Sequence, residues 1–337
     1  MSRSILIIKP SSLGDIVHTL PAVAAIREKE PDAKITWVIN PEWAPLLRGN
    51  PDVDHVHIFP RGDFQGLGAP ANILSWWRKT RTICPDVAID FQGLLRSALI
   101  AKISGAKEIY GLSDGREGSK FFYHHIARVQ RGDHAVDRYL KLAELFGAPA
   151  REPIRFPLPT GDAPPRFDPY PPFVLLHPYA RGSKKSLSAS AIEQLCQALD
   201  PERVIVVGKS ARQFHPSENC VDLTNQTSLL QLVWLIRKAA FVISVDSGPM
   251  HIAAASAQNL VSIHTWSDPR RVGPYRGEAW VWRNGTLTLA DTLADTGKLP
   301  RGRRFKAGDI ASIIELVTSS IRNQTKDRYS NEANAAK

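Results

Sequence analysis

The sequence predicts an α/β fold made of two doubly wound units, each a parallel sheet with helices on both faces. Short apolar runs typical of buried strands alternate with segments of helical spacing, which indicates β-α-β units with right-handed crossovers. The alternation is interrupted once, by the proline-rich residues 148–172, and then restarts. The chain has 337 residues, 43% of them hydrophobic, which is enough for a sizeable core in each unit.

The first half of the chain opens with an isoleucine-rich run at residues 4–8, followed by helical spacing over residues 16–30. Further apolar runs and one more helical segment follow. We expect strands at residues 4–8, 34–39, 53–59 and 86–90, and helices at residues 16–30 and 71–83.

Residues 148–172 separate the halves because proline lacks an N–H group and blocks helix interiors. The second half then repeats the alternation. We expect strands at residues 173–176, 203–207, 241–245 and 261–264, and helices at residues 189–199, 229–238 and 249–257. The polar end of the chain, residues 326–337, is expected to be a loose tail.

The charge balance favours anionic partners. Lys and Arg number 43 against 33 Asp and Glu, for a formal net charge of +10. Such an excess suits phosphates, nucleic acid or an acidic membrane surface. The sequence has no run of ~20 apolar residues that would span a membrane. Its cysteines, Cys84, Cys196 and Cys220, form no C-x-x-C pair, which fits a reducing cytosol.

Several common site motifs are missing. The G-K-S at residues 208–210 lacks the glycine that a P-loop places five residues earlier, where Arg203 stands. No G-x-G-x-x-G follows the first strand, and no H-E-x-x-H or G-x-S-x-G occurs.

The stretch S-V-D-S-G-P-M-H-I-A-A-A, which begins at residue 244, leads from a strand into a helix. Asp246, Ser247 and Gly248 form the turn, and the helix starts with a proline, which suits a first helical position. Unpaired N–H groups at a helix start attract anions, so a diphosphate fits here, with His251 as a further donor. Alternatively, Asp246 or Ser247 simply caps the helix.

The stretch K-P-S-S-L-G-D, residues 9–15, also allows two interpretations, part of a functional site or a simple helix cap. Gly14 permits a tight turn, and Ser11 or its neighbour could cap the helix. Asp15 stands where the helix begins, which electrostatics favours for any carboxylate. Because Asp15 and Asp246 both follow strand ends, facing units would bring them to one cleft.

Polar and basic residues follow two further strands. Gln92 and Gly93 form the turn after the strand at residues 86–90, and Lys184 and Lys185 follow the first strand of the second unit. The two lysines could neutralise a leaving diphosphate. A group of basic residues in the first unit either binds phosphate or is merely solvated: Arg96, Arg116, Lys120, His124, His125, Arg128 and Arg131.

The motifs together resemble a known family. K-P-S-S-L-G-D-I-V-H-T-L-P-A, A-I-D-F-Q-G-L-L-R-S-A, R-E-G-S-K-F-F-Y-H-H-I-A, D-H-A-V-D-R-Y and S-V-D-S-G-P-M-H-I-A-A-A are similar to motifs of the ADP-heptose:lipopolysaccharide heptosyltransferases, the family-9 glycosyltransferases. The resemblance covers nearly the whole chain and is nearest to the heptosyltransferase I group.

The resemblance implies a GT-B fold, with two Rossmann-like domains facing across a cleft. It implies an acceptor-binding domain over residues 1–160, a nucleotide-sugar-binding domain over residues 165–307, and a helix at residues 308–325 that packs back on the first domain. The implied activity is an inverting, metal-independent transfer of heptose from ADP-heptose to a Kdo residue of the lipopolysaccharide inner core. No cofactor is implied.

The resemblance also implies roles for individual residues. Asp15 matches the general base. The implied donor-binding residues are Lys184, Thr227, Asp246, Ser247, Gly248 and His251. The implied acceptor-binding residues are Lys9, Ser11, Gly14, Arg61, Gln92, Gly93 and Arg116. No metal ligand is implied.

The sequence departs from the family pattern on the donor side. Ser247 stands where threonine is usual, and Tyr179 and Ala180 stand where the family often has paired threonines. Alternative functions are therefore a GT-B glycosyltransferase using another nucleotide sugar, or a sugar-nucleotide epimerase. The charge alone would also suit a nucleic-acid-binding protein, but no recognition motif supports that class. We expect a monomer, cytoplasmic and peripheral on the anionic cytoplasmic face of the inner membrane.

Overall fold

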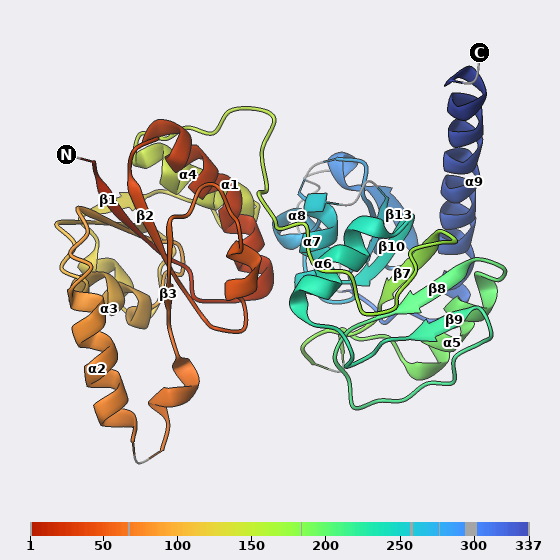
Figure 1. Ribbon diagram of the computed structural model, residues 1–337, viewed down its shortest axis with the longest axis horizontal. Coiled ribbons are helices and arrows are strands. Elements are labelled where there is room, and N and C mark those ends of the chain that lie inside the picture. The colour runs from red at the N-terminus through yellow and green to blue at the C-terminus, as the bar shows by residue number, and fades with distance from the viewer. Residues whose placement is uncertain are drawn as a thin grey trace. The chain divides into compact units, whose positions relative to one another are not determined.

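The computed structural model describes residues 2–66, 68–182, 184–256, 259–275, 277–293 and 302–335. The chain divides into two compact units, Met1–Pro159 and Thr160–Lys337 (Figure 1). The resemblance predicts a first domain over residues 1–160 and a second domain that starts at residue 165. Residue 257 of the predicted helix and residues 336–337 of the predicted tail lie outside the described residues.

The first unit is built on a parallel sheet with strand order β3-β2-β1-β4-β5-β6. Its strands are β1 (Ser4–Ile8), β2 (Lys34–Ile39), β3 (His55–Ile58), β4 (Val87–Asp90), β5 (Glu108–Leu112) and β6 (His125–Ala127). Its helices are α1 (Leu13–Lys29), α2 (Ala69–Arg81), α3 (Leu95–Ile103) and α4 (Ala135–Leu145), with short 3-10 turns η1 (Ala44–Leu47), η2 (Arg61–Phe64) and η3 (Ser119–Phe122).

Helices cover both faces of this sheet, as the sequence predicted. Helices α1 and α4 pack against each other, and α3 packs against α2 and η3 (Figure 1). Leu6 and Ile8 of β1 share a buried apolar cluster with Trp76 of α2 and Ala98 of α3. The alternation of side chains along a strand sends the neighbouring residues of β1 to the opposite face. Because β1 is central and parallel to β2 and β4, its carboxyl end opens where ligands of such sheets bind.

The second unit has strand order β13-β12-β11-β10-β7-β8-β9, and β13 runs antiparallel to β12. Its strands are β7 (Phe173–His177), β8 (Arg203–Val206), β9 (Cys220–Asp222), β10 (Phe241–Val245), β11 (Leu260–Ile263), β12 (Trp280–Arg283) and β13 (Thr286–Leu289). Its helices are α5 (Ala189–Ala198), α6 (Leu229–Lys238), α7 (Gly248–Ser256), α8 (Pro269–Val272) and α9 (Ile310–Ala335), with 3-10 turns η4 (Ala290–Thr292) and η5 (Ala307–Asp309).

Helix α9 lies in the second unit, whereas we expected residues 308–325 to pack on the first domain. Ile310, Ile313, Val317 and Ile321 form its buried stripe, and they join the core of the second unit. Their spacing matches one face of a helix, so burial against this unit fixes the position of α9. The backbone stays helical to Ala335, through residues that we expected to be loose. No glycine or proline occurs between residues 310 and 335 to end the helix.

In the described part of the chain, no helix is both long enough and apolar enough to cross a bilayer.

Candidate active site

Asp15 lies in the first turn of α1, directly after β1. Its Oδ2 accepts hydrogen bonds from the backbone N–H of Ser12 at 3.1 Å and from the Ser12 hydroxyl at 2.7 Å. Ser12 is the N-cap of α1, and Asp15 at the third helical position completes a capping box with it. The same carboxylate has a second neighbour, because the Tyr139 hydroxyl lies 3.5 Å from Oδ1. Since Asp15 is only partly buried, the cap does not enclose it.

Lys9 lies beneath this carboxylate and is only 2% exposed. Its ammonium donates to the Phe91 carbonyl at 2.9 Å and to the Tyr139 hydroxyl at 2.8 Å. Burial alone would lower the pKa of Lys9, but the attraction of Tyr139 and Asp15 outweighs it and raises the pKa above its ordinary value. Lys9 is thus a buried cation that bonds to Tyr139 and attracts Asp15.

Asp90 organises the neighbouring turn, between β4 and α3. It is fully buried, and its Oδ1 accepts from the backbone N–H groups of Gln92 at 2.8 Å and Gly93 at 3.1 Å. Its Oδ2 accepts from the hydroxyls of Ser97 and Tyr123, both at 2.7 Å. Burial raises the pKa of Asp90, while these hydrogen bonds act in the opposite direction. The buried carboxylate therefore fixes the turn that carries Gln92 and Gly93.

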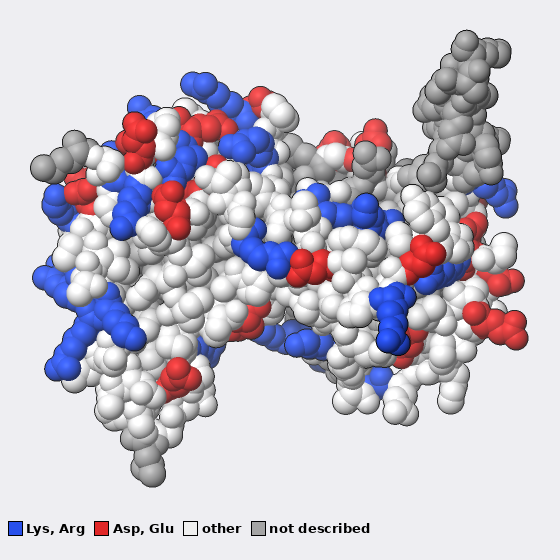
Figure 2. All heavy atoms as spheres, in the orientation of Figure 1, with Lys and Arg blue, Asp and Glu red and all other residues white. Residues whose placement is uncertain are grey.

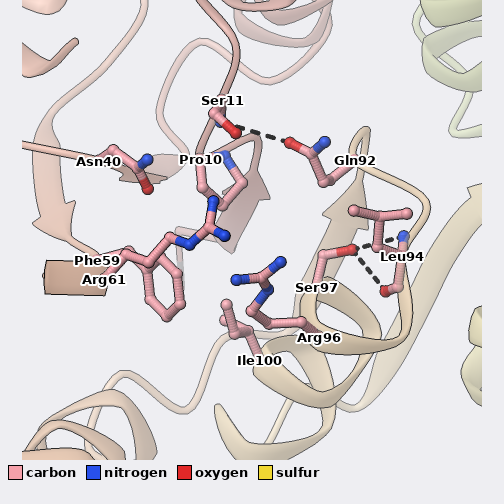
Figure 3. Close-up of a pocket in the computed structure, with 10 residues that line it drawn as sticks. All are labelled: Pro10, Ser11, Asn40, Phe59, Arg61, Gln92, Leu94, Arg96, Ser97 and Ile100. Atoms are coloured by element: carbon pink, nitrogen blue, oxygen red, sulfur yellow. Dashed lines mark hydrogen bonds between the residues drawn. The ribbon is translucent and has the colours of Figure 1, made fainter. Parts of the chain in front are cut away.

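A pocket opens between these two turns (Figure 3). It is lined by Pro10, Ser11, Asn40, Phe59, Arg61, Gln92, Leu94, Arg96, Ser97 and Ile100. The backbone N–H of Ser11 donates to the Gln92 side chain at 3.4 Å, which joins the two turns. The guanidinium groups of Arg61 and Arg96 both point into the pocket (Figure 3). The pocket thus offers two cations and several polar groups to an anionic ligand.

Three predicted acceptor residues, Ser11, Arg61 and Gln92, therefore meet in one pocket. Arg116 is exposed, and its backbone N–H donates to the Gly93 carbonyl at 2.8 Å. Gly93 adopts a φ of +69°, in the left-handed region that favours glycine. Gly14 is buried in the first turn of α1. Gly93 thus permits the turn after β4, and Gly14 lies within the turn that carries Asp15.

In the second unit, Asp246 directly follows β10 and lies two residues before α7. It is 8% exposed, and its Oδ2 accepts from the ammonium of Lys185 at 2.6 Å. The loop that carries Lys185 is anchored where the Leu187 N–H donates to the Pro178 carbonyl at 2.9 Å. The structure therefore joins the turns after β7 and β10, which are neighbours in the sheet.

The charge of Asp246 is maintained by its neighbours. Burial alone would raise its pKa, but His264 and the hydrogen bonds from Lys185 and Ser267 hold the pKa below its ordinary range. Burial lowers the pKa of His264 to about 4, so that ring is neutral at pH 7. Lys185 is then the cation that balances Asp246.

His177, the last residue of β7, contacts the turn between β10 and α7. Its Nδ1 lies 3.2 Å from the Ser247 hydroxyl and 3.4 Å from the Ser244 hydroxyl. Burial lowers the pKa of His177 to about 4, so it is a neutral hydrogen-bonding group at pH 7. The contact between His177 and Ser247 orients the start of α7, which is the predicted anion-binding site.

The remaining predicted donor residues are placed as follows. Gly248 is the first residue of α7, and His251 lies within its first turn and is 8% exposed. The side chain of Lys184 is exposed, while its carbonyl accepts from the Thr265 hydroxyl at 3.3 Å. Thr227 is partly buried just before Ser228, the N-cap of α6. Among the described residues, no group of three or more His, Cys, Asp or Glu side chains could hold a metal ion.

Sequence reasoning missed several contributors to these sites, among them Tyr139, His177 and His264. Tyr139 lies in the quoted motif D-H-A-V-D-R-Y, but only the fold brings α4 beside α1. His177 and His264 follow apolar strand runs, so a polar ring at a strand end was the available signal.

The comparisons with known proteins agree with this architecture. The model of glycosyltransferase family 9 (heptosyltransferase) matches residues 73–297. Lipopolysaccharide core heptosyltransferase OpsX of Haemophilus influenzae is 24% identical over 81% of this chain and 82% of its own. Lipopolysaccharide heptosyltransferase 1 of Pseudomonas aeruginosa is 27% identical over 87% of this chain and 86% of its own.

Solved structures show the same fold. The Escherichia coli heptosyltransferase WaaC with ADP has a TM-score of 0.72 at 21% identity, covering 93% of this chain and 99% of that one. This similarity confirms the predicted fold class, the GT-B architecture of two Rossmann-like domains. Because the family model covers more than half of the chain, the chain belongs to glycosyltransferase family 9, the heptosyltransferase family.

Proposed function

We propose that this protein transfers heptose from ADP-heptose to a Kdo residue of the lipopolysaccharide inner core, with inversion at the anomeric carbon and with Asp15 as general base. One structural observation carries the proposal. The Asp15 carboxylate stands at the carboxyl end of the central strand β1, and a pocket lined by Arg61 and Arg96 opens beside the same strand end. The relatives named as lipopolysaccharide heptosyltransferases over most of both chains support it.

Asp15 would take the proton of the acceptor hydroxyl while that oxygen forms a bond to the anomeric carbon of the donor. The bond from this carbon to the diphosphate breaks in the same displacement, and ADP leaves. A positioned carboxylate suits this role. We assign Lys9 and Tyr139 a positioning role, because the buried ammonium reaches Asp15 through the Tyr139 hydroxyl.

The second unit would hold the donor. Lys184, with its exposed ammonium, and the N–H groups at the start of α7 near Gly248 would bind the diphosphate and stabilise its charge as it leaves. His251, Ser247 and Thr227 would add hydrogen bonds. Asp246, kept ionised by Lys185, would accept hydrogen bonds from sugar hydroxyls. Because the chain supplies these cations itself, we propose that transfer requires no metal ion.

The pocket of the first unit would hold the acidic part of the acceptor. A guanidinium binds a carboxylate or phosphate through paired hydrogen bonds, and Arg61 and Arg96 present two such groups. Ser11 and Gln92 line the same pocket, and Arg116 stands at the neighbouring turn. Kdo is an acidic sugar, which agrees with this arrangement. The place of action would be the cytoplasmic face of an anionic membrane, with the protein as a monomer.

A different donor sugar is the second candidate. Ser247 stands where the family usually has threonine, and its hydroxyl is part of the turn that would face the donor. A change at this contact bears on which nucleotide sugar fits.

The test is incubation of the protein with Kdo-lipid A and a panel of nucleotide sugars, followed by mass spectrometry of the lipid. We expect the mass of one heptose to be added with ADP-heptose, in the presence or absence of EDTA. NMR of the product should show the anomeric configuration opposite to that of the donor. Transfer only from another nucleotide sugar would replace the donor assignment. Absence of any lipid product would reject the proposed function.

A further inference from the structure

We propose that the outer surface formed by α2, α3 and η3 binds an anionic lipid bilayer through apolar side chains set among cations. We call this surface the α2–α3 face. Its apolar members are Leu74, Trp77, Leu95, Leu99 and Phe121, and its cations are Arg78, Lys79, Arg81, Lys102 and Lys120. The proposal goes beyond the transfer reaction, because it concerns a surface outside the pocket.

The apolar side chains of this face are unusually exposed. Phe121 is 93% exposed, Leu74 is 48% and Trp77 is 44% exposed. On α3, Leu95 and Leu99 are one helical turn apart and each 37% exposed. A group of large exposed apolar side chains on one surface is typical of a site that binds another protein or a membrane.

These side chains belong to one continuous layer. Helix α3 packs against α2 and against η3, and all three contribute to one side of the sheet. The buried sides of α2 and α3 carry Trp76 and Ala98, so the exposed residues point away from the sheet. At the far end of the helices, the Arg81 guanidinium packs closely against Gly105, just beyond α3.

The charge on the two helices of this face has a single sign. Residues 64–85 and 91–107, which include α2 and α3, contain no Asp or Glu. Within the described residues, the cations Arg78, Lys79, Arg81 and Lys102 form no ion pair. Figure 2 shows Lys and Arg side chains gathered over α2 at the left of the view. Such a face is attracted to anionic lipid head groups, and this attraction depends on salt.

A bilayer fits these features better than a second copy of the chain or a nucleic acid does. A second copy of the chain would bring cations against cations. Nucleic acid would bind the cations but would leave the exposed leucines without a partner. A lipid surface binds Lys and Arg through its head groups and also accommodates apolar and aromatic side chains. The face also adjoins the pocket, because Arg96 and Ile100 of α3 line the pocket while Leu95 and Leu99 lie on the face. A lipid-anchored acceptor would then be presented beside the pocket.

The test is sedimentation of the full chain with vesicles of phosphatidylcholine, with and without phosphatidylglycerol. We expect binding only to the anionic vesicles, weakened by salt. The variant Leu74→Ser/Trp77→Ser/Phe121→Ser should lose roughly tenfold or more in binding, and Arg78→Glu/Lys102→Glu should lose a similar amount. Leu145→Ser on α4, which is also 44% exposed, and Lys29→Glu/Lys34→Glu are the matched controls and should bind as the unmodified protein does.

Thermal unfolding of each variant checks that it folds, since all the changed side chains are exposed. Equal vesicle binding by the Leu74→Ser/Trp77→Ser/Phe121→Ser variant and the unmodified protein would overturn the proposal. So would salt-sensitive binding to RNA in place of vesicles, or a dimer in solution that this variant dissociates. Transfer to a detergent-solubilised acceptor should be unchanged in this variant. That assay separates failure of the membrane proposal from failure of the proposed function.

Discussion

The ammonium of Lys9 donates a 2.8 Å hydrogen bond to the hydroxyl of Tyr139. The same ammonium lies 4.8 Å from the centre of the Tyr139 ring, so the contact has both a hydrogen-bonded and a cation–π part. Because the hydroxyl also lies 3.5 Å from Asp15, a buried positive charge is linked to the proposed base through one side chain.

Tyr139→Phe tests this link, because it removes the hydroxyl and keeps the ring over Lys9. We expect transfer to fall roughly tenfold, the usual scale for a lost charge-assisted hydrogen bond, with little change in ADP affinity. Lys9→Met should move the acid limb of the pH–rate profile to higher pH, because it removes the cation that favours ionised Asp15. Unchanged profiles in both variants would show that Lys9 and Tyr139 serve only the fold.

Lys184 and Lys185 are neighbours with different predicted roles. Lys184 is exposed, so Lys184→Ala should weaken ADP binding by about tenfold without lowering the melting temperature. Lys185 bonds to Asp246, so Lys185→Ala should leave a buried carboxylate without its cation, raise the pKa of Asp246 and lower the melting temperature. Calorimetric binding and thermal unfolding of both variants check this, and the reverse pattern would exchange the two assignments.

The buried histidines predict how stability depends on pH. The pKa of His177 and of His264 is about 4, below the ordinary value of 6.5. The unfolded chain therefore binds more protons than the folded one between these values, so the free energy of unfolding falls as pH drops from 6.5 towards 4. The slope should reach about 1.4 kcal/mol per pH unit for each histidine.

Urea unfolding at several pH values in this window measures the slope, and His177→Gln should reduce it. A slope that His177→Gln leaves unchanged would mean that this ring is not buried in its neutral form.

Asp90 predicts a large loss of stability. It accepts four hydrogen bonds from buried or partly buried groups, so Asp90→Ala should lower the free energy of unfolding by about 3 kcal/mol or more. The exposed Asp32→Ala is the control and should change it by less than about 0.5 kcal/mol. Equal effects in urea unfolding would contradict the role given to Asp90.

The sequence was sufficient for the features that depend on local pattern. The sequence predicted strands β1 and β10 and the polar turns after them, because the burial of a strand and the residue types of a turn can be recognised from adjacent residues. Strand β5 was not predicted, because its run E-I-Y-G-L contains a glycine. A Cβ at Gly111 would lie 2.2 Å from the Tyr123 ring, so a contact distant in sequence requires that glycine.

The parts of the site that sequence did not predict are also contacts between distant residues. Lys9 and Tyr139 are separated by 130 positions, and Lys185 and Asp246 by 61. The apolar stripe of helix α9 shows that the helix is buried, but not which elements it packs against. Spacing and propensity carry no information about such partners.

Asp15→Asn gives the most direct test of the proposed mechanism. The amide keeps the size of the side chain but cannot take the acceptor proton. We predict that Asp15→Asn binds ADP-heptose as the unmodified protein does and that its rate of transfer to Kdo-lipid A falls by roughly 10²-fold or more. Transfer by Asp15→Asn at the unmodified rate would contradict the account, because the base would then lie elsewhere.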